Sequence, residues 1–116
     1  MKLASIQSRR QSVAKQLKQV RQNTLDLLAE VDQSLFFKQA HPEFSPIGWH
    51  FGHRAFTEAS WILEQLAGLP VNLPEYQRLF AADGLPKQER QNLPTINTIR
   101  QYLDVVRTKT LACTYL

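Results

Sequence analysis

Residues 45–53 read Ser-Pro-Ile-Gly-Trp-His-Phe-Gly-His, and this stretch predicts the start of a helix that carries two histidines. Ser45 is a good N-cap residue, because its hydroxyl oxygen can accept a hydrogen bond from a free amide of the first turn. Pro46 suits the first helical position, where its missing N–H costs no hydrogen bond. Beyond it, mostly apolar residues recur at steps of three and four and share one face with His53. This face comprises Trp49, His53, Phe56, Ser60, Leu63 and Ala67.

The position of His53 on an apolar face allows two interpretations. It is a candidate metal ligand, or it is a core histidine held by a hydrogen bond. A transition metal needs two or three further ligands, and His50, three residues earlier, can share a metal with His53. His50 can equally be a partly exposed residue on the helix flank. The sequence shows no serine–histidine–acid arrangement, glycine-rich phosphate loop or zinc-finger spacing, so we assign no catalytic residue.

The N-terminal segment predicts a long amphipathic helix over residues 3–36, because no glycine or proline occurs before Pro42. Its apolar positions follow a seven-residue pattern, with Arg10 as the one polar interruption. Such spacing is typical of the narrow seam of a helical bundle. The positions on this seam are Leu3, Ile6, Val13, Leu17, Val20, Thr24, Leu27 and Val31.

Two further helices are expected after the histidine motif. The second spans 46–67 and is stopped by Gly68. Residues 68–94 contain four prolines and predict a crossover connection, with a short helix near Glu75 to Ala81. A third helix over 95–114 begins at a threonine that can cap it.

The chain of 116 residues therefore predicts one all-α domain, 1–116, of the up-down four-helix-bundle type. Its fourth helix is missing or supplied by a partner chain. Residues 111–116 are mostly apolar, which favours either a homodimer or a chain cut from a longer protein. Exchange of a helix between two copies would complete such a bundle.

The formal net charge is +4, and six of the 14 lysines and arginines fall before residue 22. Because they alternate with glutamine and serine, a solvated helix face is favoured over a nucleic-acid surface. The single Cys113 excludes an internal disulfide. No signal peptide and no apolar run of about 18 residues is present. We therefore expect a cytoplasmic protein that does not associate with membranes.

Four pieces of this sequence carry a family resemblance: the Ser-Pro-Ile-x-Trp-His-x-x-His motif from residue 45, Tyr-Gln-Arg-Leu-Phe at 76–80, Leu-Pro-Thr at 93–95 and Tyr-Leu-Asp-Val-Val-Arg at 102–107. Together they resemble the DinB-like superfamily. The chain looks most similar to the N-terminal domain of the ergothioneine-biosynthesis sulfoxide synthases, and the resemblance covers nearly its whole length.

The resemblance implies a four-helix bundle with a three-histidine site for a divalent transition metal such as iron, zinc or nickel. His53 matches the family's first ligand, and His50 occupies a neighbouring position that is often acidic. In the family the other two ligands form a His-x-x-x-His pair on a later helix, but no histidine follows His53 here. The formylglycine-generating-enzyme-like domain that completes the substrate site of the sulfoxide synthases is also absent.

These departures imply that this chain is not catalytic alone, and whether it serves an enzyme stays open. The related chemistry is that of non-haem iron sulfoxide synthases and metal-dependent thiol transferases, so a longer parent protein would act on a small thiol substrate. The alternative is a non-enzymatic, dimerising interaction module whose histidines are structural.

Overall fold

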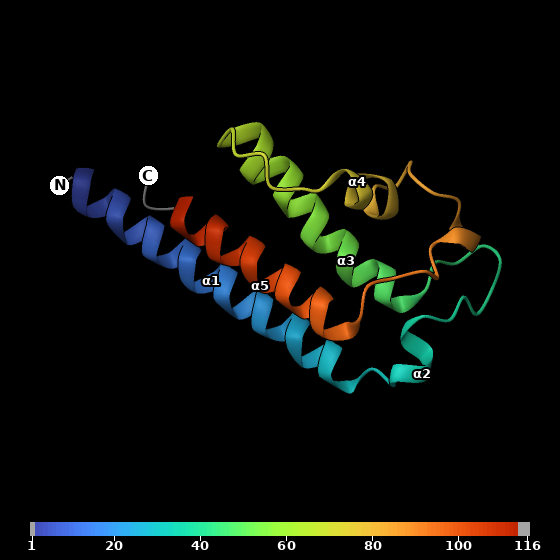
Figure 1. Ribbon diagram of the computed structural model, residues 1–116. Coiled ribbons are helices and arrows are strands. Elements are labelled where there is room, and N and C mark those ends of the chain that lie inside the picture. Colours follow the sequence, from blue (N-terminus) through green and yellow to red (C-terminus); the bar gives the residue numbers. More distant parts are fainter. Residues whose placement is uncertain (1, 114–116) are drawn as a thin grey trace.

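The computed structural model describes residues 2–113, with side chains from Ser5 onward, and every regular element in this range is helical (Figure 1). The predicted all-α class is therefore confirmed. The elements are α1 (Lys2–Glu30), α2 (Gln33–Phe36), α3 (Ile47–Glu58), the π-helix η1 (Ala59–Leu66), α4 (Pro74–Phe80), the 3₁₀-helix η2 (Lys87–Glu89) and α5 (Ile96–Cys113).

Helix α5 lies at the centre of the arrangement. It packs against α1 on one side and against α3 on the other, whereas α1 and α3 meet mainly through the side-chain pairs Arg21–Glu58 and Thr24–Arg54. In Figure 1, α1 and α5 run side by side in opposite directions, and α3 runs in the same direction as α5. The crossover that contains α4 makes this parallel pairing feasible. The result is three long helices of a bundle, with the side between α1 and α3 left open.

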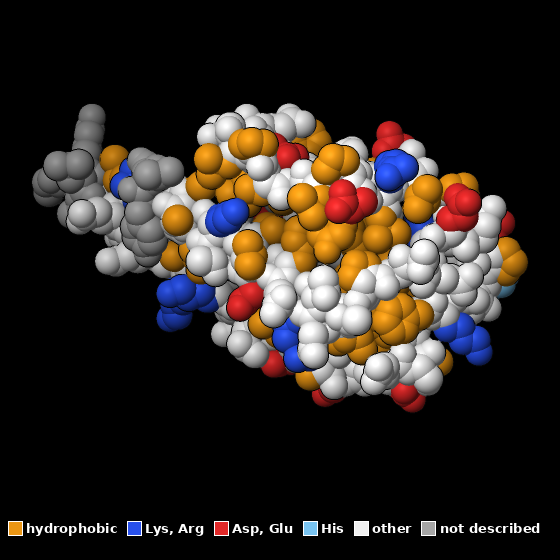
Figure 2. Space-filling view, viewed as in Figure 1, with side chains coloured by type: hydrophobic (Ala, Val, Ile, Leu, Met, Phe, Trp, Pro, Cys, Tyr) orange, Lys and Arg blue, Asp and Glu red, His pale blue; other side chains and the backbone are white. Residues whose placement is uncertain are grey.

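The core is formed mainly by α3, α4 and α5. On the face seen in Figure 2, apolar side chains gather across the middle of the molecule, where these three helices meet. The largest buried side chains come from five different helices, so the core joins the short α2 and α4 to the long helices. They are Phe36, Phe80, Leu28, Leu63, Ile99 and Leu103.

Helix α1 buries a different line of residues from the predicted seam. Leu17 and Val31 are half-buried and Thr24 is buried, as the seven-residue pattern predicts. The other described seam positions remain 44–58% exposed, because α5 contacts the adjacent line instead. The apolar pattern is therefore present along α1, but its exposed positions have no packing partner within the described chain. The exposed positions are Ile6, Val13, Val20 and Leu27, and the buried ones next to them are Ala14, Arg21 and Leu28.

The predicted first helix, 3–36, is wrong in one respect, because it is interrupted after Glu30. Asp32 adopts an extended backbone and its carboxylate accepts a hydrogen bond from the Ser34 amide at 2.9 Å. It therefore caps a separate turn, α2, which turns Phe36 into the core. An aspartate within an otherwise periodic segment was the signal for this break.

Ser45 does not cap α3, contrary to the sequence prediction. The N-cap residue is Pro46, one position later, and no side chain caps this helix. The Pro46 carbonyl accepts from the Trp49 amide at 3.0 Å. The Ser45 hydroxyl instead accepts a hydrogen bond from Arg90 at 3.0 Å, a residue of the crossover 45 positions away.

The second half of the predicted helix 46–67 is helical but has π-type hydrogen bonds. The Ala67 amide donates to the Ile62 carbonyl, five residues back, at 3.0 Å. Gly68 then ends the segment with a φ of 72°, the left-handed conformation that glycine adopts without steric cost. The predicted stop at Gly68 is confirmed, whereas the change of hydrogen-bond register was not predicted.

The remaining elements agree closely with the sequence predictions. The short helix is Pro74–Phe80, one residue earlier than expected. Thr95 accepts a hydrogen bond from the Thr98 amide at 3.2 Å and caps α5 as predicted. Helix α5 is described to Cys113, and residues 114–116 of the predicted apolar end lie outside the described range. Among the described helices, none combines the length and apolar character needed to cross a membrane.

Candidate functional site

His53 lies near the middle of α3, at the boundary between the core and the open side of the bundle. Its ring is half-buried and stacks on Trp49, with centroids 4.6 Å apart and planes within 11°. The two rings share one face of α3, as the four-residue spacing predicts. Trp49 is fixed in turn, because its indole N–H donates to the Leu79 carbonyl at 2.5 Å.

The Nδ1 atom of His53 lies 2.6 Å from the carbonyl oxygen of Phe80. A carbonyl oxygen only accepts, so Nδ1 carries the hydrogen in this contact. With the hydrogen on Nδ1, a neutral imidazole has its lone pair on Nε2. The last carbonyls of a helix have no hydrogen-bond partner within that helix. At the end of α4, the Leu79 and Phe80 carbonyls accept hydrogen bonds from Trp49 and His53 of α3 instead.

The Nε2 atom of His53 has no strong partner among the described residues. The Thr57 hydroxyl lies 3.4 Å away, and this hydroxyl donates its one hydrogen to the His53 carbonyl at 2.8 Å. The lone pair on Nε2 is therefore left without a donor in this part of the chain. A histidine with Nδ1 bound to a carbonyl and Nε2 bare has the arrangement that protein metal ligands commonly show.

His50 lies on a different side of α3. It is exposed, its ring contacts the edge of Trp49 with centroids 5.2 Å apart, and it lines a separate cavity at the end of the bundle. Burial lowers the pKa of His50, and the charges of His53, Arg90 and Arg54 lower it further. The lowered pKa favours the neutral ring, which can accept a hydrogen bond. The structure does not place His50 in the cavity that His53 lines.

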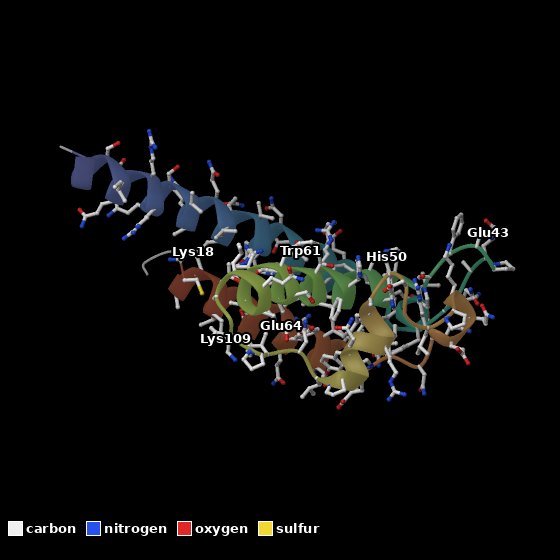
Figure 3. All side chains as sticks on the ribbon, turned by 90° about the horizontal axis from the view of Figure 1, so that it is seen from above. Lys18, Glu43, His50, Trp61, Glu64 and Lys109 are labelled. Carbon is white, nitrogen blue, oxygen red and sulfur yellow. The ribbon has the colours of Figure 1, made fainter. Side chains whose placement is uncertain are left out.

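The open side of the bundle forms a groove between α1 and α3, which we call the α1–α3 groove. It encloses about 500 Å³. In Figure 3, Trp61 lies on the side of η1 toward α1 and Glu64 lies on the opposite side. The residues that define this groove are Leu17, Val20 and Thr24 of α1, His53 and Thr57 of α3, and Trp61 of η1.

A buried ion cluster, which sequence analysis missed, forms the base of the groove. The Glu58 carboxylate accepts from Arg107 Nη2 at 2.6 Å and Nε at 3.0 Å, and from Arg21 Nη2 at 2.8 Å. The Thr110 hydroxyl donates to it at 2.7 Å. Arg107 also donates to the Leu17 carbonyl and so joins α1 to α5.

The ion cluster leaves the base of the groove positively charged. Arg21 and Arg107 meet a single carboxylate, and the positive charge of Arg54 also acts on Arg21. Burial lowers the pKa of Arg21, and the charge of Arg107 lowers it further. The Nε atom of Arg21 is buried without a hydrogen-bond partner in the structure. The cluster thus carries more positive charge than its own carboxylate balances.

No three histidine, cysteine, aspartate or glutamate side chains within the described range come close enough to hold one metal ion. The described residues therefore do not supply a complete ligand set around His53. Cys113, the one cysteine of the sequence, is half-buried and forms no disulfide.

Comparison with known proteins agrees with this architecture. A search among curated proteins finds no match to the chain. The family model described as the DinB superfamily matches residues 16–114, which cover the second half of α1, the histidine motif on α3 and α5. The chain therefore belongs to the DinB superfamily.

Proposed function

We propose that this chain is a DinB-like metal-binding domain in which His53 supplies one ligand and a partner chain supplies the others. The observation that carries this proposal is the hydrogen bond from His53 Nδ1 to the Phe80 carbonyl, at 2.6 Å. It orients the ring and leaves Nε2 bare beside the α1–α3 groove, where a fourth helix of the bundle would lie. A divalent transition metal such as iron, zinc or nickel would accept this nitrogen.

The partner that best fits the groove is a second copy of this chain. The exposed positions of the α1 seam lead along one edge of the groove toward Trp61, which is 62% exposed. A helix with the same seven-residue pattern can pack against this seam, and α1 of another copy carries it. We therefore propose a homodimer in which a helix of each protomer completes the bundle of the other.

In the related chemistry, the metal would activate oxygen or a thiol on a small substrate. The resemblance of residues 45–53 to the sulfoxide synthases of ergothioneine biosynthesis supports this class. His53 is the one family ligand that this sequence provides, so we propose no catalytic step for the chain alone. A longer parent protein or an assembled dimer would carry the activity.

The second candidate is a dimerising module without a metal, in which both histidines are structural. The stacking of His53 on Trp49 at 4.6 Å favours it, because a histidine that is half-buried and hydrogen-bonded already stabilises the join between α3 and α4. In this case Nε2 contacts only Thr57 or water.

Metal content and mass in solution, measured on the same purified sample, separate the two candidates. The metal-binding proposal expects close to one transition metal per chain in a dimer, lost on His53→Ala. His41→Ala is the matched control, because His41 lies in an exposed loop and should leave metal content unchanged.

A metal-free dimer in which His53→Ala lowers stability by roughly 1–3 kcal/mol would support the structural module instead. A metal that remains after His53→Ala would contradict the metal-binding proposal. A monomer at micromolar concentration would contradict the dimer in both. His50→Ala tests whether the second histidine contributes to the same metal.

A further inference from the structure

A second cavity lies at the end of the bundle where α2, the loop before α3 and the crossover meet; we call it the end cavity. It encloses about 630 Å³, within the range of roughly 300–1,000 Å³ found for small-molecule sites. His50 lines it, whereas His53 lines the α1–α3 groove. Figure 3 shows Glu43 in the loop and His50 on α3 toward this same end of the molecule. The end cavity is therefore distinct from the groove.

The walls of the end cavity are apolar side chains that are left open to solvent. Leu35 is 52% exposed, Phe44 is 62% exposed and Ile47 is 49% exposed. They come from α2, the loop and α3, three segments separated in sequence. Single exposed apolar residues are normal on a protein surface, but here three of them line one hollow together. This arrangement favours a ligand with an apolar body.

The polar groups of the end cavity are mainly cationic. Lys38, Lys87 and Arg90 line it together with one carboxylate, Glu43. In the described part of the chain both ion pairs involve Glu58, so neither lysine is neutralised by a carboxylate. The Lys87 ammonium donates to the Glu43 backbone carbonyl at 2.6 Å, which holds it at the rim. Three cations against one anion give this cavity a local charge of about +2.

Arg90 is built into the wall of the end cavity rather than free at its surface. It is 6% exposed, and its guanidinium carbon lies 4.1 Å from the centre of the Trp49 ring. It donates to the Leu85 and Ala82 carbonyls at 2.9 Å each and to the Ser45 hydroxyl at 3.0 Å. Ser45 accepts in this bond and keeps its own hydrogen to donate. Arg90 thus adds fixed positive charge beside a hydroxyl donor.

We propose that the end cavity binds a small organic anion with an apolar, ring-sized body. The anionic group, a carboxylate or a phosphate, lies between Lys38 and Lys87, within reach of the Ser45 hydroxyl. The apolar body packs on Leu35, Phe44 and Ile47. No side chain caps the α3 N-terminus, and the helix dipole there adds to the positive potential. This site is independent of the metal proposed at His53.

Titration calorimetry with three probes tests this proposal on the full chain. The probes are 4-phenylbutyrate, its neutral analogue 4-phenylbutanamide and 2-phenylethyl phosphate. The expected result is that the carboxylate binds about tenfold more tightly than the amide, because two unpaired lysines face the anionic group. The double substitution Lys38→Gln/Lys87→Gln should remove this preference. The double substitution Lys15→Gln/Lys18→Gln on the exposed side of α1 has the same change of charge and should keep it.

The substitution Phe44→Ser provides a second test, which probes the apolar contact and does not depend on charge. Because Phe44 is 62% exposed in a loop, its replacement should leave the fold intact. It should weaken the binding of 4-phenylbutyrate and of 4-phenylbutanamide by a similar factor, since both probes lose the same apolar contact. Comparison of the carboxylate with the phosphate identifies the favoured anion. Three results would each overturn the proposal. They are equal affinity for the acid and the amide, an equal loss of the carboxylate preference in Lys15→Gln/Lys18→Gln, and no binding of any probe at millimolar concentration.

Discussion

Glu58 and His53 stand five residues apart on one helix, yet their surroundings differ in kind. The Glu58 carboxylate is 10% exposed and receives bonds from α1 and α5, so three helices meet at one side chain. At Nε2, His53 has only the Thr57 hydroxyl nearby among the described residues, at 3.4 Å, and that hydroxyl donates to the His53 carbonyl. One position is saturated with partners and therefore serves stability, whereas the other keeps a lone pair and is open to a ligand.

Replacing Glu58 by glutamine should destabilise the protein strongly. The change leaves Arg21 and Arg107 facing each other without the carboxylate, and removal of one member of a buried ion pair typically costs about 3 kcal/mol or more. Urea unfolding followed by circular dichroism measures this loss. Glu30→Gln, at an exposed position on α1, is the control and should change the free energy of unfolding by less than about 0.5 kcal/mol.

The contribution of Glu58 should depend on pH. Burial alone would raise the pKa of the Glu58 carboxyl, but the hydrogen bonds from Arg107 and Thr110 and the charges of Arg107 and Arg21 together lower it below its usual 4.5. A lowered pKa in the folded state adds stability above the usual pKa, and this stability is lost as pH falls. The difference in unfolding free energy between wild type and Glu58→Gln should therefore be constant near neutral pH and shrink below about pH 4.5. A difference that grows on acidification would contradict the ion cluster.

At the scale of elements, the contact between α3 and α4 depends on the absence of a side chain. A Cβ atom built on Gly52 would lie 2.1 Å from the ring of Phe80, which is fully buried. The close approach also brings the Leu79 and Phe80 carbonyls within reach of Trp49 and His53. Gly52 thus sets the distance at which α4 can orient the candidate ligand.

Gly52→Ala should therefore destabilise the protein, although alanine is the better helix former by about 1 kcal/mol. Overpacking costs typically 1–3 kcal/mol, and the buried Phe80 ring has nowhere to move. The double variant Gly52→Ala/Phe80→Leu frees space, so its loss of stability should be smaller than the sum of the two single losses. Strictly additive losses in denaturant unfolding would show that the two residues do not meet as described.

On the scale of the whole molecule, the arrangement is a bundle with one position open. α5 packs against both α1 and α3, and the α1 seam remains exposed at Ile6, Val13 and Val20. The molecule measures 55 × 29 × 22 Å, and α1, which borders this open side, extends along its long direction (Figure 1). A partner helix can therefore contact both the seam and the groove.

Charges placed on the α1 seam should prevent association without unfolding the protomer. Sedimentation velocity should show a dimer for the wild type and a monomer for Val13→Glu/Val20→Glu, since two carboxylates would be buried in an apolar contact. Helical circular dichroism should be unchanged. Val105→Glu on α5 is the control, because Val105 is 52% exposed but lies outside the groove. A double variant that still sediments as a dimer would show that the seam is not the interface.

Sequence reasoning predicted those features whose cause is local. Gly68 ends a helix and Thr95 begins one through bonds within a few residues, and both signals were sufficient. The short helix at Pro74–Phe80 was found by the same means. Ser45 shows where local reasoning fails. Its hydroxyl could cap the next helix or bind a distant residue, and in the structure it accepts a hydrogen bond from Arg90.

The unpredicted features depend on contacts across the fold. Arg21 and Arg107 lie 37 and 49 positions from Glu58, and no spacing rule brings them together. The π-type register of Ala59–Leu66 differs from an α-helix only in which carbonyl each amide selects, and the apolar pattern is too coarse to distinguish them. The hydrogen bond that orients His53 likewise required α4 to be in place.

The eight residues of η1 also have an evolutionary consequence. A helix that gains a residue can retain its hydrogen bonds by shifting to the i→i+5 register, and a π segment can return to an α-helix by losing one. A one-residue deletion at Ser60 would therefore be absorbed locally, with His53 unmoved. It would rotate Trp61 by about 100° around the helix axis, away from the groove. Length variation among relatives at this point would thus alter the aromatic wall of the groove while sparing the histidine.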